Sequence, residues 1–160
     1  MAQHLIPTIR KLTARDADAV IHLSHVLNPD VDIADAAHFA QMAARDDLTV
    51  MGAEIDKQIV AMATLHILPN MGNGGRPFGV IENVVTLPQF QRRGIMRAVM
   101  QQLHDIGWQA NAYKIMLMTG RDTGAKAFYE KLGYSGAQKH GMQIRRVPAR
   151  KPHGMVGGAT

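Results

Sequence analysis

The spacing of apolar residues along the chain alternates between a period typical of strands and a period typical of helices. Short apolar or β-branched runs bounded by turn residues predict strands. These runs fall at residues 8–11, 49–55, 59–67, 80–87 and 115–118, with a final pair at 134–138 and 141–147. Apolar residues at helical spacing predict helices at residues 13–26, 33–45, 95–110 and 124–132. The sum is a mixed α/β domain in which helices pack on a sheet.

Local signals mark the ends of several elements. Thr13 followed three residues later by Asp16 is a weakened form of the capping box that begins a helix. The polar triplet at 56–58 predicts a hairpin between two strands. Gly133 is placed to end the last helix. The fully apolar run IMLM at 115–118 is typical of a central strand covered on both faces.

Length and composition limit the class of protein. The chain has 160 residues, 46% of them apolar and 19% charged, which is typical of one globular domain. We expect this domain over residues 1–147 and a flexible, glycine-rich tail over 148–160. The chain has no cysteine, which excludes disulfides and thiolate chemistry. No apolar run approaches the roughly 18 residues that span a bilayer, and the first residues lack a secretory apolar core, so we expect a cytoplasmic protein without a membrane partner.

The net charge of +5 favours an anionic partner. Nucleic acid is one candidate, but no helix-turn-helix pattern accompanies the charge, and aromatic residues make up only 5% of the chain. We therefore expect no nucleic-acid partner. The histidines are scattered without the spacing of metal ligands, so we expect no metal either.

A basic, glycine-containing turn follows the strand predicted at 80–87 and leads into a long helix. It holds Gly94 together with Arg92, Arg93 and Arg97. A helix N-terminus presents unpaired N–H groups and a positive dipole end, and glycine lets a ligand approach the backbone closely. This pattern indicates a phosphate or pyrophosphate site, and the alternative is an ordinary helix start with arginines that face solvent.

Two motifs at matched spacing favour the phosphate site over the ordinary helix start. The segment 80–134 reads VIENVVTLPQFQRRGIMRAVM, continues to IMLMTGRDTGAKAFYEKLGY, and resembles the GNAT superfamily of acetyl-CoA-dependent N-acetyltransferases. The family phrase Q/R-x-x-G-x-G/A corresponds to QRRGIM, and a family phrase like FYEKLGF corresponds to FYEKLGY. The resemblance implies a mixed sheet of about six to seven strands with about four helices. It also implies strands that splay apart at an acetyl-CoA site.

The resemblance assigns coenzyme contacts to two stretches of the chain. The implied contact residues are Val84, Val85, Thr86, Gln91, Arg92, Arg93, Gly94, Ile95, Met96, Arg97, Asp122, Ala125, Phe128 and Tyr129. Among them, Val85 is expected to bond the pantetheine arm through its backbone. Met96 stands where the family has Gly or Ala, and Asp122 stands where many relatives have Asn.

The resemblance also implies direct attack of an amine on the thioester, and two residues are candidates for the proton transfers. Glu82 is the candidate base, acting directly or through a water, and its alternative is a strand carboxylate that faces solvent or an arginine. Tyr129 is the candidate acid for the leaving thiolate, and its alternative is a half-buried core tyrosine. Glu82 and Tyr129 are thus the predicted catalytic residues.

Three functions remain open at this point. The first is transfer of the acetyl group to a primary amine of a small molecule. An amino-sugar phosphate and an amino acid are the candidate acceptors. The second is N-acetylation of a protein or peptide. The third is a module that binds acetyl-CoA without turnover. Relatives are commonly homodimers, so a homodimer is expected as well.

Overall fold

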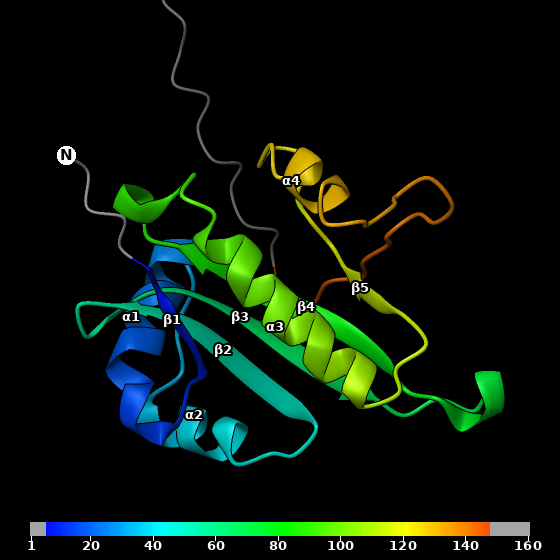
Figure 1. The fold of residues 1–160 in the computed structure, drawn as a ribbon, viewed down its shortest axis with the longest axis horizontal. Helices are drawn as coiled ribbons and strands as arrows, with labels where there is room; N and C mark the ends of the chain where they lie inside the picture. Colours follow the sequence, from blue (N-terminus) through cyan, green and yellow to red (C-terminus); the bar gives the residue numbers. More distant parts are fainter. Residues whose placement is uncertain (1–5, 148–160) are drawn as a thin grey trace, which may run out of the picture. The chain divides into compact units, whose positions relative to one another are not determined.

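The computed structural model describes residues 6–147 (Figure 1), and along the chain they divide into two compact units, the first ending at Leu117 and the second beginning at Met118. The first unit holds most of the secondary structure. Its elements are β1 (Thr8–Lys11), α1 (Ala17–Leu27), α2 (Ala36–Ala43), β2 (Leu48–Ile55), β3 (Gln58–Leu68), β4 (Phe78–Thr86), α3 (Ile95–Gln109) and β5 (Ile115–Leu117), with short 3₁₀ turns at Ala14–Asp16, Asn73–Gly75 and Pro88–Phe90. No helix of the described residues is long and apolar enough to cross a membrane.

The five strands of the first unit form one sheet in the order β1-β2-β3-β4-β5. Neighbouring strands are antiparallel except for β4 and β5, which are parallel. The predicted mixed α/β class, with helices on a sheet, is confirmed. The run at 115–118 is not a central strand, however. Within the described residues β5 pairs only with β4, so it lies at the sheet edge, and the side chain of Met116 is exposed.

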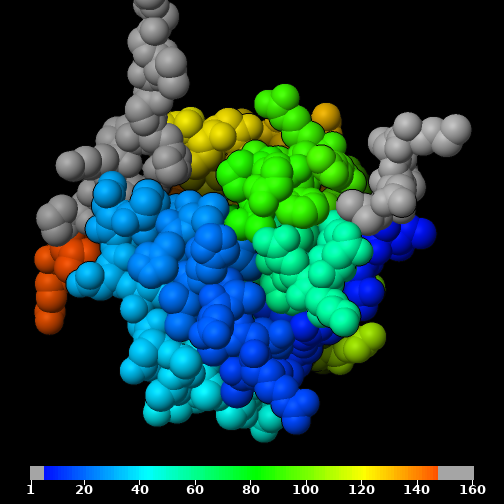
Figure 2. All heavy atoms as spheres, turned by 90° about the vertical axis from the view of Figure 1, so that its left-hand side faces the viewer, coloured from blue at the N-terminus to red at the C-terminus, as the bar shows by residue number. Residues whose placement is uncertain are grey.

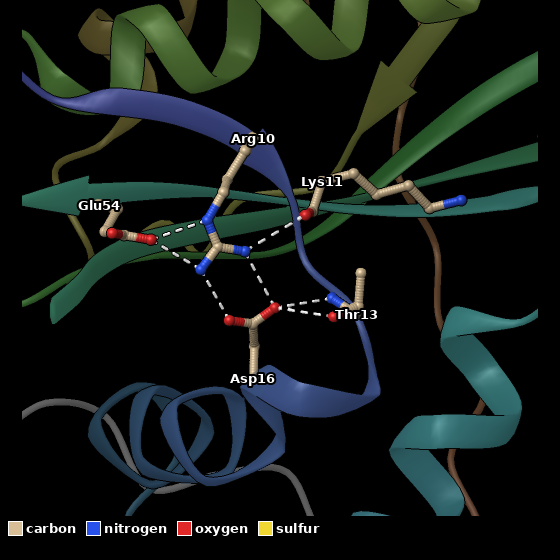
Figure 3. A network of polar contacts seen from close by, with 5 residues as sticks. All are labelled: Arg10, Lys11, Thr13, Asp16 and Glu54. Carbon is tan, nitrogen blue, oxygen red and sulfur yellow. Dashed lines mark hydrogen bonds and ion pairs between the residues drawn. The ribbon is translucent and has the colours of Figure 1, made fainter. Parts of the chain in front are cut away.

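Arg10 joins β1 to β2 and to the start of α1 (Figure 3). Its guanidinium donates to the two carboxylate oxygens of Asp16 at 3.0 and 2.8 Å, and to Glu54 at 2.7 Å. The Asp16 carboxylate also accepts the backbone N–H of Thr13 at 2.8 Å, so the predicted capping box is formed. Because the Arg10 guanidinium hydrogen-bonds it, the pKa of Asp16 falls to about 2.

The predicted hairpin between β2 and β3 is formed, but it turns through two residues rather than three, since Gln58 is already part of β3. Asp56 and Lys57 have φ values of 49° and 65°, so both adopt the left-handed conformation of a type I′ turn. This turn twists in the same sense as the strands it connects, which fixes the register of the longest pair in the sheet. The predicted strands at 49–55 and 59–67 are therefore confirmed, each slightly longer at its ends.

Helices pack against both faces of this sheet, with α3 on one face and α1 and α2 on the other (Figure 1). The interface with α3 is close because Gly107 has no side chain. A Cβ at that position would lie 2.6 Å from Cδ1 of Ile115. The apolar stripe of α3 provides the rest of the contact, with Val99 and Leu103 fully buried.

The helix predicted at 33–45 is shorter than expected. It begins after Asp35, whose carboxylate accepts the backbone N–H of His38 at 2.9 Å and caps the first turn of α2. The residues before Asp35 instead form a connection between α1 and α2. A side-chain cap within the predicted range thus sets the start of the helix.

The second unit contains α4 (Lys126–Glu130). The helix is shorter at both ends than the predicted 124–132, but Gly133, which has a φ of 95°, closes its last turn as predicted. The N–H of Tyr134 donates to the carbonyl of Tyr129 at 3.1 Å and that of Gly133 to Glu130 at 3.0 Å, which is the Schellman arrangement.

The strands predicted at 134–138 and 141–147 are wrong, since the described residues there form no strand. Ile144 and Met142 are 102% and 87% exposed, so their apolar side chains have no buried face that would fix a strand register. The single domain expected over 1–147 stays a prediction. The tail predicted over 148–160 lies outside the described residues.

Candidate active site

A β-bulge interrupts β4 at Asn83. The register with β3 pairs Thr64 with Glu82 and Met62 with Val85, so β4 has one residue more than β3 over this stretch. Asn83 has a φ of 54°, a left-handed conformation that asparagine tolerates better than most residues. The bulge bends the second half of β4 immediately after Glu82.

The bulge coincides with the point where β4 and β5 part. Their parallel pairing runs from Gly79 with Ile115 to Ile81 with Leu117 and goes no further. Within the first unit, residues 82–86 therefore have a partner strand on the β3 side only. The splayed pair of strands that the resemblance implies stays a prediction, because β5 ends at Leu117, the last residue of the first unit.

The hydrogen-bond alternation decides which backbone groups point to the open side of β4. The N–H of Leu87 donates to the carbonyl of Val60 on β3 at 2.8 Å. Because successive residues of an antiparallel strand alternate in direction, Val85 also bonds toward β3, whereas Val84 and Thr86 direct their N–H and C=O groups to the open side. The expected bond between the Val85 backbone and the pantetheine arm stays a prediction, and the alternation makes Val84 and Thr86 the better candidates for it.

The predicted anion loop follows directly. Arg92 and Gly94 have φ values of 61° and 77°, so two left-handed residues flank Arg93 just before α3. No side chain caps the N-terminus of α3, and no heavy atom lies within 4 Å of the position that a Cβ of Gly94 would occupy. The first N–H groups of α3 thus have no side-chain cap among the described residues, which leaves them available to an anion.

The side chains of the loop are mostly exposed. Arg92, Arg93 and Arg97 form no ion pair within the described part of the chain, and the Arg93 guanidinium lies 5.6 Å from the centre of the Phe90 ring. Ile95 is buried in the core and Met96 is half-buried. The arginines are therefore available to an anionic ligand, and Ile95 anchors the helix start.

Glu82 is exposed at the bulge. It is paired with Thr64, and residues opposite each other in an antiparallel pair point to the same face of the sheet. That face is the one covered by α1 and α2, since Thr64 lines a cavity together with residues of both helices. The predicted base thus lies on the face of the sheet that carries this cavity.

The cavity has a volume of about 280 Å³ and lies entirely within the first unit. Its apolar wall comes from α1, α2, β2 and β3, with Val20, Phe39, Met42, Val50 and Met62. Asn83 of the bulge also lines it. In Figure 2 the two helices that cover it, α1 in blue and α2 in cyan, adjoin on one face of this unit.

No motif predicted this cavity, and its polar residues were missed. Asp32 and Asp35, in the connection between α1 and α2, line it and form no ion pair with any described residue. Thr64 is only 2% exposed, and its hydroxyl has no hydrogen-bond partner among residues 6–147. The alternation of apolar and acidic residues over 31–35 is the one signal in the sequence that could have indicated a lined pocket.

The remaining predicted residues belong to the second unit. Tyr129 is buried in α4, and its ring packs edge-on against Phe128 at 5.2 Å and Tyr134 at 6.0 Å between ring centres. Burial raises the pKa of Tyr134 above its usual range. Ala125 precedes the first turn of α4, and Asp122 lies in the exposed turn before it.

Within residues 6–147, no group of three or more His, Cys, Asp or Glu side chains is arranged to hold a metal ion. The chemistry available in the first unit therefore comes from an open strand edge, an uncapped helix N-terminus with arginines, a carboxylate and a lined cavity. An elongated ligand with an anionic end fits the first two features, because the edge offers amide partners and the helix start offers N–H groups.

A family model and several known proteins match this chain. The model of a family described as the acetyltransferase (GNAT) family matches residues 16–134. A curated glucosamine 6-phosphate N-acetyltransferase of Trypanosoma brucei brucei is 37% identical over 90 residues, which make up 55% of this chain and 56% of that protein. The match thus spans little more than half the length of this relative.

Two solved structures are similar over most of the chain. A putative acetyltransferase from Agrobacterium tumefaciens has 39% identity and a TM-score of 0.81, with 87% of this chain and 99% of that chain covered. A Trypanosoma brucei acetyltransferase has 28% identity and a TM-score of 0.75, with 88% and 98% covered.

Proposed function

Because this chain belongs to the GNAT family of acetyltransferases, we propose that it transfers the acetyl group of acetyl-CoA to a primary amine of a small molecule. The amine attacks the thioester directly while both substrates are bound. The observation that carries the proposal is the bulge at Asn83, which opens one edge of β4 immediately before the uncapped N-terminus of α3.

Coenzyme binding follows from the order of these features. The pantetheine arm lies along the open edge as an added strand, bonded to the backbone of Val84 and Thr86. The pyrophosphate lies on the N–H groups at the start of α3, close to Gly94, and Arg92 and Arg97 add full positive charges.

The amine must lose a proton before it can attack. With a pKa near 10.4, only about 0.04% of a primary alkylamine is neutral at pH 7. Glu82 receives this proton, directly or through a water, from the cavity face of the sheet. Its replacement in Glu82→Gln is expected to change the pH–rate profile, and an unaltered profile would remove Glu82 from this role.

The carbon–sulfur bond breaks as the new carbon–nitrogen bond forms, and the departing thiolate takes a proton. Tyr129 supplies this proton from its phenol, as its place in the FYEKLGY motif suggests. The nitrogen of the new amide gives up its extra proton to the resulting phenolate, directly or through water, so the phenol is regenerated, and Glu82 returns the first proton to solvent. Asp122, Ala125 and Phe128 are proposed to contact the coenzyme from the same unit. The free thiol and the acetylated amine are the two products, so the step needs no metal and no oxidant.

The size of the cavity favours a small acceptor over a protein. A volume of about 280 Å³, lined by α1, α2 and three strands, is close to the lower end of small-molecule sites. A peptide substrate would instead need an open groove. The cytoplasmic location and the homodimer remain expectations.

The test follows the release of free thiol from acetyl-CoA with and without a panel of primary amines. The proposal expects release that depends on the amine and saturates with it. Stabilisation of the protein by acetyl-CoA without amine-dependent release would instead support a non-catalytic binding module. Release with peptides only would support a protein N-acetyltransferase.

A further inference from the structure

The residues that line the cavity indicate the charge of its ligand as well as its size. Apolar and polar side chains share its wall, with Ser24, Asn28, His38 and Asn83 among the polar ones, and no lysine or arginine is among the described residues that line it. The charged groups are the carboxylates of Asp32 and Asp35. A ligand that carries positive charge is therefore favoured there, and a ligand that carries a phosphate is not.

Both carboxylates retain capacity to bind a cation. Asp35 uses one oxygen to accept the backbone N–H of His38 at 2.9 Å, which leaves its other oxygen free. Asp32 has no hydrogen bond or ion pair with a described residue. A carboxylate has room for about four hydrogen bonds, so both residues can accept N–H groups from a ligand.

Thr64 provides an independent indication of a ligand in this cavity. It is 98% buried on β3, and its hydroxyl lacks a partner among the described residues. A buried polar group without a hydrogen bond is costly, so native proteins almost always satisfy such groups. The hydroxyl can donate and accept, which suits an amine that approaches the paired position, Glu82.

We propose that the acceptor is an unphosphorylated diamine or polyamine with an apolar spacer, and this rests on the proposed acetyl transfer. One amine reaches the bulge, where Glu82 and Thr64 lie on neighbouring strands. The second amine stays protonated and binds Asp32 and Asp35, while the spacer lies against the apolar wall. The curated relative, by contrast, is named for glucosamine 6-phosphate, a phosphorylated amine.

The experiment compares kcat/KM for a series of α,ω-diaminoalkanes, the monoamines of equal length, glucosamine and glucosamine 6-phosphate. We expect the best diamine to exceed its monoamine about threefold to fivefold, since Asp32 and Asp35 are exposed and exposed ion pairs contribute modestly. Glucosamine 6-phosphate should be the poorest acceptor. Equal rates for diamines and monoamines, or a preference for the phosphorylated sugar, would overturn the inference and leave the acetyl transfer standing.

Charge-neutral variants test the assigned groups. Asp32→Asn and Asp35→Asn keep the shape of the side chains, and asparagine retains the cap of α2. Each is expected to raise KM for the diamine about two- to fivefold and to change KM for the monoamine less. The matched control is Asp30→Asn, a nearby exposed position that does not line the cavity. Equal effects of the three substitutions would contradict the assignment.

Calorimetric titration of the diamine supplies a readout that does not depend on turnover. Binding that weakens in Asp32→Asn and in Thr64→Val supports the assignment. Binding that is unchanged in both variants overturns it. A complete absence of thiol release with every amine would contradict the acetyl transfer itself, and the inference with it.

Discussion

The side-chain amide of Gln91 donates a hydrogen bond of 3.1 Å to the backbone carbonyl of Thr86. This contact ties the start of the anion loop to the last residue of β4. It lies on the open side of the strand, because Thr86 directs its polar backbone groups away from β3. The side chain of Gln91 thereby holds the anion loop to the open side of β4, where the pantetheine arm is proposed to bind.

Loss of this contact should weaken coenzyme binding. In Gln91→Ala we expect the dissociation constant of coenzyme A to rise about threefold to tenfold, since one net hydrogen bond contributes roughly 1 kcal/mol. Calorimetric titration measures the change. The control is Gln101→Ala, which removes an exposed bond of 3.1 Å to Asp105 within α3. If the two variants bind equally well, Gln91 does not organise the site.

A side chain at position 94 should weaken coenzyme binding more than it destabilises the folded protein. No atom stands in its way, so the cost of Gly94→Ala comes from the positive φ of 77°, about 1–2 kcal/mol, or from a shift of the loop that avoids it. We expect a fall in melting temperature of a few degrees and a loss of coenzyme affinity of tenfold or more.

The matched control for Gly94 is Gly133→Ala. Gly133 also has a positive φ, 95°, with no atom near its Cβ position, but it ends α4. Its replacement should lower the melting temperature to a similar extent and leave the helix start of α3 intact. Similar losses of coenzyme affinity in both variants would contradict the proposed role of the loop.

Stability should depend on pH through Asp16. A carboxyl whose pKa is lower in the folded state stabilises the protein above its unfolded pKa, and this contribution is lost as the pH falls through the folded value. With a shift from 3.8 to about 2, the contribution of Asp16 is complete above about pH 4 and is lost toward pH 2. Because Arg10 is 36% exposed, we expect only about 1–2 kcal/mol.

Urea unfolding of Asp16→Asn between pH 7 and pH 2 tests this effect. The variant should be less stable than the parent at pH 7, and the difference should shrink as the pH falls below 4. Asp47→Asn is the control, because its pair with Arg45 is exposed on both sides and should contribute little. A difference for Asp16→Asn that is constant with pH would show that the lost interaction is not ionic.

Tyr129→Phe tests the proposed acid. The ring and its packing against Phe128 stay in place, so we expect the protein to fold normally. The expected result is a kcat lowered by about tenfold to a thousandfold, with little change in coenzyme affinity. Tyr134→Phe removes a neighbouring phenol and is the control. A Tyr129→Phe rate equal to that of the parent would exclude the phenol as the acid.

Much of the backbone around the proposed coenzyme site was predictable because its signals are local. Pro88 ends the strand, Gly94 adopts the left-handed conformation before α3, and Gly133 ends α4, each through its own backbone preference. The bulge at Asn83 was not predicted, because the extra residue becomes visible only in the register of β4 against β3. Without that register, the sequence could not show which of residues 84–86 direct their backbone N–H and C=O groups toward β3 and which direct them to the open side.

The acceptor side depends on contacts between distant segments. Asp32 reaches the same cavity as Thr64 only after α1 and α2 pack on the sheet, so no spacing along the chain could bring them together. The strands predicted at 134–138 and 141–147 failed for a related reason. An apolar residue such as Ile144 stabilises a strand only if a neighbouring surface buries its side chain. The side chain of Ile144 is fully exposed.

The most direct test of the account follows an isotope-labelled acetyl group from acetyl-CoA by mass spectrometry in the presence of a diamine. Direct acetyl transfer predicts that the label appears on the amine nitrogen in an amount equal to the free thiol released, and that no label remains on the protein. Thermal stabilisation by acetyl-CoA without labelled product from any amine would contradict it.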